Sequence, residues 1–94
     1  MKRIFKQELK ITDEQTITIP EKTVFLSCKE QDGELVIWYL CQLESQITDV
    51  KIRIIGTGNE IDDDFFDIND VFYLDTVIMK NGFVWHIFIV GEEE

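Results

Sequence analysis

The chain has 94 residues and a mass of 11.1 kDa, which suffices for one hydrophobic core and therefore for a single domain spanning residues 1–94. Hydrophobic residues make up 45% and charged residues 30% of the sequence, a composition that excludes an intrinsically disordered protein. The 19 acidic and 9 basic side chains give a net charge of −10, which disfavours direct binding to nucleic acid.

Alternating hydrophobic and polar residues predict seven short β-strands separated by turn residues. In chain order the predicted strands cover residues 3–10, 16–19, 24–30, 35–41, 50–55, 71–79 and 83–90. No window has the apolar spacing of an amphipathic helix, and residues 60–70 can form at most one short helical turn. The pattern therefore predicts an all-β fold, namely a small antiparallel β-sandwich or partly open barrel of six to seven strands.

Two dipeptides predict tight hairpins in this fold. Asp32-Gly33 supplies the positive φ angles of a two-residue type I′ turn. The pairs expected around it are Gln31 with Glu34, Cys28 with Ile37, Leu26 with Tyr39 and Val24 with Cys41. Asn81-Gly82 predicts a second such turn. Its core face should hold Phe72, Leu74, Thr76 and Ile78 beside Phe83, Trp85, Ile87 and Ile89, and the opposite face is apolar enough to require its own cover.

The two cysteines and the single histidine do not form a recognisable catalytic or metal set. In the predicted hairpin Cys28 and Cys41 share a face about 13 Å apart, too far for a disulfide, and act as small hydrophobic residues of a reducing cytoplasm. The predicted register places His86 opposite Val77 and diagonal to Asp75, which favours a structural role for the imidazole. We therefore expect no catalytic residues, no metal and no cofactor.

An acidic stretch without lysine or arginine begins at residue 60. Its candidate partner-binding residues are Glu60, Asp62, Asp63, Asp64, Asp67 and Asp70. Phe66 and Asp67 stand where a calcium loop needs its third ligand and its glycine, so a solvated acidic loop is the default interpretation. As a functional surface, the stretch suits a basic groove that normally receives phosphates. The first ten residues are basic by contrast, and residues 92–94 predict a frayed acidic tail.

A glycine-rich turn offers an alternative site for a small ligand such as a nucleotide. Its candidate residues are Lys51, Arg53, Gly56, Thr57, Gly58 and Asn59. The full phosphate-binding motif has a third glycine and opens a helix, and both features are missing here, so a tight turn is the simpler interpretation. Lys51 and Arg53 are the cations best placed to meet a phosphate.

Several blocks of sequence, which together span most of the chain, carry a family resemblance. They are Met1-Lys2-Arg3-Ile4-Phe5-Lys6 with Leu9, Thr12-Asp13-Glu14-Gln15-Thr16-Ile17, Ile19-Pro20, Leu26-Ser27, Trp38, Arg53-Ile54, Gly56-Thr57-Gly58 and Phe83-Val84-Trp85-His86-Ile87-Phe88. On these blocks the chain resembles a family of small uncharacterised bacteriophage and prophage proteins, a domain of unknown function. Members often have a histidine where this chain has Asn59, which weakens the case for a shared histidine-based activity.

The resemblance implies a phage protein that works in the cytoplasm of a bacterial host. Together with the charge, it favours an accessory protein that binds rather than catalyses, as an acidic, anti-CRISPR-like or DNA-mimic inhibitor of a host defence or nucleic-acid-binding protein. The alternatives are a nucleotide-binding sponge and a structural or assembly protein of the virion, for which self-association into a homo-oligomer suffices. No apolar stretch reaches the roughly 20 residues of a transmembrane helix, so no membrane partner is expected.

Overall fold

The computed structural model describes residues 1–91, and the predicted acidic tail at residues 92–94 lies outside the described residues. The strands are β1 (Lys2–Leu9), β2 (Glu14–Pro20), β3 (Thr23–Gln31), β4 (Glu34–Gln42), β5 (Ile47–Gly56), β6 (Asp70–Ile78) and β7 (Val84–Gly91), and the helix α1 (Phe65–Ile68) precedes β6. Within residues 1–91 no helix has the length and apolar character needed to cross a membrane.

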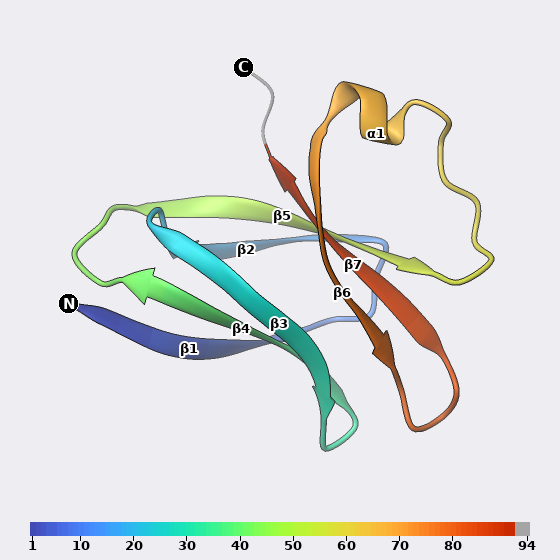
Figure 1. Cartoon of the computed structure of the whole chain (residues 1–94), viewed down its shortest axis with the longest axis horizontal. Helices are drawn as coiled ribbons and strands as arrows, with labels where there is room; N and C mark the ends of the chain where they lie inside the picture. The colour runs from blue at the N-terminus through green and yellow to red at the C-terminus, as the bar shows by residue number, and fades with distance from the viewer. Residues whose placement is uncertain (92–94) are drawn as a thin grey trace.

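The strands form two antiparallel sheets, which confirms the predicted all-β sandwich with one short helical turn (Figure 1). The three-stranded sheet has the order β1-β4-β3, and the four-stranded sheet has the order β2-β5-β7-β6. The chain passes from one sheet to the other after β1, after β2 and after β4. The two sheets are therefore interleaved along the sequence and share one core.

The core lies between the facing sides of the two sheets. The three-stranded sheet contributes Leu9, Cys28, Leu35, Ile37, Tyr39 and Cys41, and the four-stranded sheet contributes Ile17, Ile19, Ile52, Ile54, Val77 and Ile87. Both cysteines are buried and free. Burial, with a smaller contribution from the negative charge of Asp75, raises the pKa of Cys28 to about 12, so this thiol stays protonated and packs as a small hydrophobic residue.

The turn between β3 and β4 is the predicted one, with φ angles of 52° at Asp32 and 85° at Gly33. The pairs nearest the turn are also as predicted, namely Gln31 with Glu34 and Cys28 with Ile37. A β-bulge between Phe25 and Ser27 then shifts the register by one residue. The predicted pairs of Leu26 with Tyr39 and of Val24 with Cys41 are therefore wrong, and Val24 pairs instead with Leu40.

The loop between β6 and β7 is one residue longer than predicted. The N–H of Met79 donates to the carbonyl oxygen of Phe83 at 2.8 Å, so three residues, 80–82, form the loop. Gly82 has a φ of 93°, the left-handed conformation that typically closes a three-residue hairpin loop. The predicted positive φ angle at Gly82 is therefore confirmed, and the predicted two-residue loop length is wrong.

This extra loop residue changes the partner and the direction of the side chains near the end of β6. Thr76 pairs with His86, where the sequence predicted Val77. Val77 is 4% exposed and Ile78 is 73% exposed, so the prediction that Thr76 and Ile78 face the core is wrong. Successive strand residues point to opposite faces, and a shift of one residue therefore exchanges core and surface positions.

The predicted core face of this hairpin is otherwise partly confirmed. Trp85, Ile87 and Ile89 of β7 all pack on the main core, and so does Leu74 of β6. Phe72 and Phe83 were expected beside them but are 64% and 61% exposed. Both lie near the ends of the hairpin, where the three-stranded sheet does not cover them.

Side chains rather than a strand pairing join the two sheets where β3 lies beside β6, a contact that we call the seam (Figure 1). The Asp75 carboxylate accepts the N–H of Cys28 at 3.0 Å and lies 3.3 Å from the ammonium of Lys29. The Glu30 carboxylate likewise accepts the N–H of Lys80 at 3.2 Å. Burial opposes ionisation of Asp75, but hydrogen bonds from backbone N–H groups and from Lys29 outweigh it and lower the pKa of this carboxyl.

Candidate functional site

The acidic stretch folds as a cap over the outer face of the four-stranded sheet. Residues 57–70, here called the acidic cap, link β5 to β6 and include α1, which Figure 1 shows above the start of β6. Phe65 is 8% exposed and packs with Ile55 and Val90 in a hydrophobic cluster separate from the main core. Of the outer face that the sequence predicted to need cover, Phe88 and Val90 therefore receive it from the chain itself, whereas Tyr73 stays 59% exposed and Val77 and Met79 lie in the main core.

Aromatic rings and one cation fix the acidic cap to the sheet. Phe66 meets Phe65 and Phe88 edge to face, with ring centroids 5.0 Å and 5.5 Å apart, and Tyr73 meets Phe88 at 5.8 Å. The guanidinium carbon of Arg53 lies 4.9 Å from the centre of the Phe65 ring, a cation–π contact. Arg53, which the sequence suggested as a phosphate ligand, thus contacts the acidic cap.

All six predicted partner-binding residues lie on the acidic cap and are exposed. They are Glu60, Asp62, Asp63, Asp64, Asp67 and Asp70. None of them forms an ion pair with any other residue in the part of the chain that the structure describes. Two apolar residues of the same segment, Phe66 and Ile68, are 50% and 51% exposed. The acidic cap therefore combines negative charge with two accessible apolar side chains on a segment that Phe65 anchors.

A chain of side-chain hydrogen bonds crosses the same sheet next to the acidic cap. The imidazole of His86 is 2.8 Å from the hydroxyl of Thr57 through Nε2 and 3.0 Å from that of Thr76 through Nδ1. The Thr76 hydroxyl is in turn 2.6 Å from the hydroxyl of Tyr73. The sequence predicted neither threonine as a partner of the histidine, because the predicted register placed Thr76 on the core face.

These contacts orient the histidine without giving it a carboxylate. Asp75, the predicted diagonal neighbour of His86, accepts hydrogen bonds in the seam instead. The N–H of Thr57 already donates to Val84, and the N–H of Asn59 donates to Gly56, so both amides have intramolecular acceptors. The arrangement can hold the ring and order the hydroxyls, and a structural role for His86 stays a prediction.

The glycine-rich segment after β5 is a tight turn. The N–H of Asn59 donates to the carbonyl oxygen of Gly56 at 3.0 Å, and Gly58 has a φ of 88°. A Cβ on Gly56 would lie 2.9 Å from the Asn59 amide nitrogen and 3.0 Å from the Trp85 ring, so the close packing requires glycine. The simpler of the two interpretations of this segment is therefore correct locally.

A hollow of about 400 Å³ opens between this turn and the β6–β7 loop. It is lined by Gly56, Thr57, Asn59, Gly82, Phe83, Val84 and Trp85. Lys51 and Arg53 are not among the lining residues, and the ammonium of Lys51 lies 3.5 Å from the carboxylate of Glu14. The structure thus brings most of the predicted ligand turn together with two aromatic rings, but not with the two predicted cations.

Among residues 1–91 no group of three histidine, cysteine, aspartate or glutamate side chains has a spacing that could hold a metal ion. Over its whole length, residues 1–94, the chain matches the family described as Domain of unknown function (DUF7352). No curated protein and no solved structure matches the chain. The family description names no substrate, ligand or partner.

Proposed function

We propose that this chain, which belongs to the DUF7352 family, acts by binding rather than catalysis and docks its acidic cap on a basic surface of a partner protein. The observation that carries the proposal is the composition of the cap. Residues 60–70 carry six exposed carboxylates that form no ion pairs among residues 1–91, together with the accessible side chains of Phe66 and Ile68. Charge complementarity speeds the encounter of two proteins, and buried aromatic side chains supply much of the affinity.

Anchoring by Phe65 favours this function because it reduces the cost of binding. A free acidic loop would lose conformational freedom when it docks, whereas the aromatic contacts and the Arg53 contact already hold the acidic cap on the sheet. The net charge of −10 extends the attraction toward a basic partner beyond the contact itself.

The class of partner follows from the charge and from the resemblance to bacteriophage and prophage proteins. A row of carboxylates can occupy the groove of a protein that normally binds phosphates. We therefore propose a phage-derived inhibitor that meets a nucleic-acid-binding or defence protein in the cytoplasm of a bacterial host and competes with its nucleic acid.

The test is capture of partners from a bacterial lysate on the tagged full chain, at low and at moderate salt, with identification by mass spectrometry. The matched control is Asp62→Asn, Asp63→Asn and Asp67→Asn in one chain, which removes charge and leaves Phe65 and the start of α1 in place. We expect a salt-sensitive partner that the control captures at least tenfold less and that a DNA duplex displaces from the wild-type chain. A partner retained equally by the control would refute docking through the acidic cap.

The hollow beside the glycine turn supports a second candidate function, the binding of a small flat ligand. The rings of Phe83 and Trp85 line this hollow with their centroids 5.9 Å apart, and Phe83 is 61% exposed, so a flat heterocycle can stack on Phe83 there. We expect such a ligand to raise the melting temperature of the wild-type chain and to lose this effect with Phe83→Ala. A screen of nucleotides and related heterocycles without any shift would rule against this candidate.

A further inference from the structure

The strand β1 pairs with β4 on one side and has no strand partner among residues 1–91 on the other. The carbonyl oxygen of Met1 accepts the N–H of Leu43, which follows β4, at 3.2 Å. In an antiparallel pair the direction of these groups alternates, so the backbone groups of odd-numbered residues of β1 face β4. Those of the even-numbered residues point to the side without a partner, here called the free edge. They belong to Lys2, Ile4, Lys6 and Glu8.

The other sheet edges carry features that limit pairing with a further strand. On β3, the Asp75 carboxylate occupies the N–H of Cys28 and a bulge interrupts the strand. On β6 the register shifts between Tyr73 and Asp75. On β2 the strand ends in Pro20, which has no N–H to donate. The strand β1 has neither a proline nor a register shift, so it offers the longest uninterrupted row of donors and acceptors among these edges.

The charges of β1 are mixed and lie on the outer face of the sheet. The ammonium of Lys6 is 2.7 Å from the side-chain oxygen of Gln31 on β3, which draws this lysine across β4 and away from the free edge. Beside it, a hollow is lined by the carboxylates of Glu8, Asp32 and Glu34.

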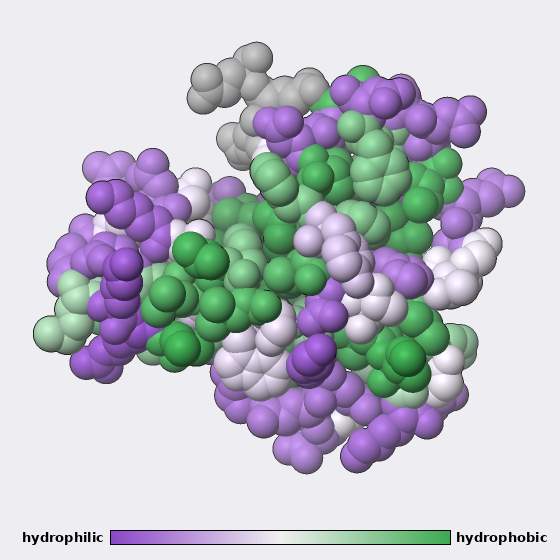
Figure 2. Space-filling model, in the orientation of Figure 1, coloured by the Kyte–Doolittle hydropathy of each residue, from purple (hydrophilic) through white to green (hydrophobic). Residues whose placement is uncertain are grey.

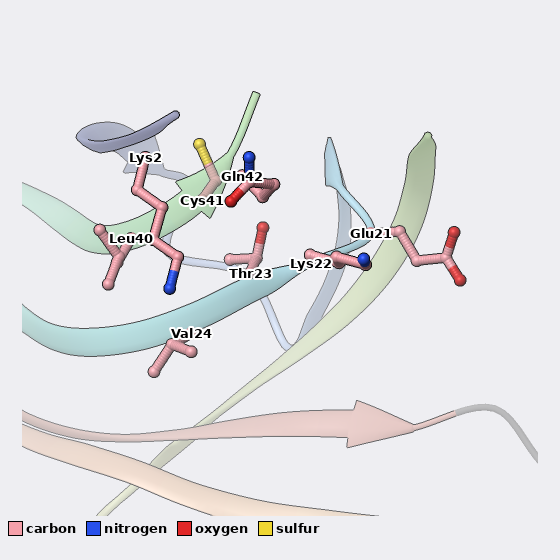
Figure 3. Close-up of a pocket in the computed structure, with 8 residues that line it drawn as sticks. All are labelled: Lys2, Glu21, Lys22, Thr23, Val24, Leu40, Cys41 and Gln42. Atoms are coloured by element: carbon pink, nitrogen blue, oxygen red, sulfur yellow. The ribbon is translucent and has the colours of Figure 1, made fainter. Parts of the chain in front are cut away.

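Lys2 lies at the other end of β1, beside a hollow of about 280 Å³ (Figure 3). Its side chain runs past Leu40 toward Val24, and it forms no ion pair among residues 1–91. This long side chain can therefore turn toward a carboxylate placed at the free edge.

Pairing of β1 with its own copy is restricted to a few registers. Two copies extend one sheet with their core sides together only if an odd-numbered residue faces an odd-numbered one. An antiparallel register centred on Ile4 places Lys2 opposite Lys6, and one centred on Lys6 places Lys6 opposite itself. Like charges directly opposite each other are destabilising, so both registers are unfavourable. A register centred on Gln7 pairs only residues 5–9 of the strand.

The register centred on Phe5 has none of these defects. It places Lys2 of each copy opposite Glu8 of the other, so two pairs of opposite charge form. Phe5, which is 41% exposed, meets its own copy on the symmetry axis. The ring of Phe5 already lies 6.3 Å from that of Tyr39, so the new aromatic pair adds to an existing one. The remaining pairs are Arg3 with Gln7 and Ile4 with Lys6.

We infer that β1 binds β1 of a second copy, antiparallel and centred on Phe5, so that the two three-stranded sheets become one continuous sheet. The contact is the same on both copies, so it closes at a dimer. Figure 2 shows hydrophilic side chains around the start of β1, which lies at the left in Figure 1. One strand pairing with a polar border is a small interface, and copies of charge −10 repel each other. The dimer therefore forms at high protein concentration and dissociates on dilution.

The free edge is separate from the acidic cap, so this inference goes beyond the proposed function and does not depend on it. Figure 1 shows β1 at the lower left and α1 at the upper right. The dimer contact therefore leaves both acidic caps accessible, and the particle has two docking surfaces in place of one. A target with two suitable sites would bind such a dimer more tightly than it binds the single chain.

Sedimentation equilibrium of the full chain over a range of concentrations tests the inference. We expect the average mass of the wild type to rise from 11.1 kDa toward twice that value and no further. Ile4→Pro removes an N–H from the free edge and leaves the hydrogen bonds to β4, so this variant should stay at 11.1 kDa. The control is Thr16→Pro on β2, which also removes an outward N–H and should associate as the wild type does. Circular dichroism and thermal unfolding verify that the variants are folded.

Two charge reversals test the register without a backbone change. Lys2→Glu and Glu8→Lys each place like charges opposite each other and should weaken the dimer about tenfold. An equimolar mixture of the two variants restores both pairs of opposite charge and should form a dimer as the wild type does. Glu8→Lys changes the net charge from −10 to −8, which by general repulsion alone would strengthen association, so its weakening is specific.

Cross-linking locates the symmetry axis. Phe5→Cys places two thiols opposite each other, within disulfide distance, and a mild oxidant should convert this variant into a covalent dimer. Gln7→Cys is the control, because its two thiols would lie roughly 13 Å apart. Equal cross-linking of the two variants would overturn the register, and a wild type that stays monomeric at every concentration would overturn the inference. So would a dimer that forms only after residues 92–94 are removed, since those residues would then be the occupant of the free edge.

Discussion

The outer faces of the two sheets both carry apolar side chains, but within residues 1–91 a connecting segment packs over only one of them, that of the four-stranded sheet. On the four-stranded sheet the acidic cap buries Ile55 and Val90 beneath Phe65. On the three-stranded sheet Ile4 and Val24 remain exposed. Since this small chain does cover the outer face of one sheet, its length alone does not explain why the other outer face is exposed. Substitutions on the two faces should therefore change the unfolding free energy to different extents.

The largest effect on stability is expected from Phe65→Ala, which removes the buried ring of the covered face. Loss of a buried phenylalanine side chain costs about 3 kcal/mol or more of unfolding free energy, and this site should lie near the lower end because its cluster is small. Urea unfolding measures the loss, and hydrogen exchange should show faster exchange in residues 57–70. Phe66→Ala is the matched control and should cost less than about 1 kcal/mol, since that ring is half exposed. Equal losses would show that Phe65 does not anchor the cap.

Gly56→Ala should have the next largest effect, because the new methyl group would collide with the Trp85 ring and the Asn59 amide. Overpacking of this kind costs about 1–3 kcal/mol, measured by urea unfolding. Adding Asn59→Ala in the same chain removes one of the two collisions and should recover part of the loss. No recovery would mean that Trp85 alone sets the requirement for glycine.

Asp75→Asn tests the seam between β3 and β6, which lies apart from the outer faces of both sheets. The lowered pKa means that ionised Asp75 stabilises the folded chain above its ordinary value of 3.8, and this stabilisation is lost as the pH falls below 3.8 through the folded-state pKa. We expect the variant to be about 1–2 kcal/mol less stable at pH 7 and to match the wild type at low pH. Unfolding measured from pH 7 downward checks this, with Asp49→Asn as the control for an exposed carboxylate. A deficit that is constant with pH would point to altered packing instead of charge.

The smallest effect on stability is expected on the uncovered face. Ile4→Ser and Val24→Ser should each change the unfolding free energy by less than about 0.5 kcal/mol, because both side chains are already in contact with water. Urea unfolding measures both changes, with Phe65→Ala as the comparison on the covered face. A loss of stability as large as that of Phe65→Ala would remove the contrast between the two faces.

Alternating residues sufficed to predict the seven strands and the all-β fold class, since side-chain direction in a strand alternates from one position to the next. The alternation does not predict where a strand has a bulge or how long a loop is. Asp32-Gly33 and Asn81-Gly82 look equivalent in the sequence, yet the second belongs to a three-residue loop, and the hydrogen bond that fixes its length joins Met79 to Phe83. The bulge in β3 between Phe25 and Ser27 and a second register shift, in β6 between Tyr73 and Asp75, depend on packing against the partner strand and have no marker in composition.

The charged residues of the candidate site were predictable from the sequence, but the contacts that hold the acidic cap on the sheet were not. The six acidic residues stand out by composition, whereas the burial of Phe65 depends on where the chain after β5 returns to the sheet. Arg53 seemed free for a phosphate because the sequence does not show that the Phe65 ring lies beside it. Thr76 as a partner of His86 could have been found from the sequence by also considering the three-residue loop.

The seam has a consequence for the solubility of the chain during folding and storage. The backbone N–H of Cys28 on the edge strand β3 is a donor that a strand of another molecule could pair with, and Asp75 occupies it with a carboxylate. Glu30 does the same for the N–H of Lys80 beyond the end of β6. Two carboxylates thus protect neighbouring sheet edges from the edge-to-edge pairing that starts amyloid-like aggregation. Conditions that protonate Asp75 should be those in which fibrils form first.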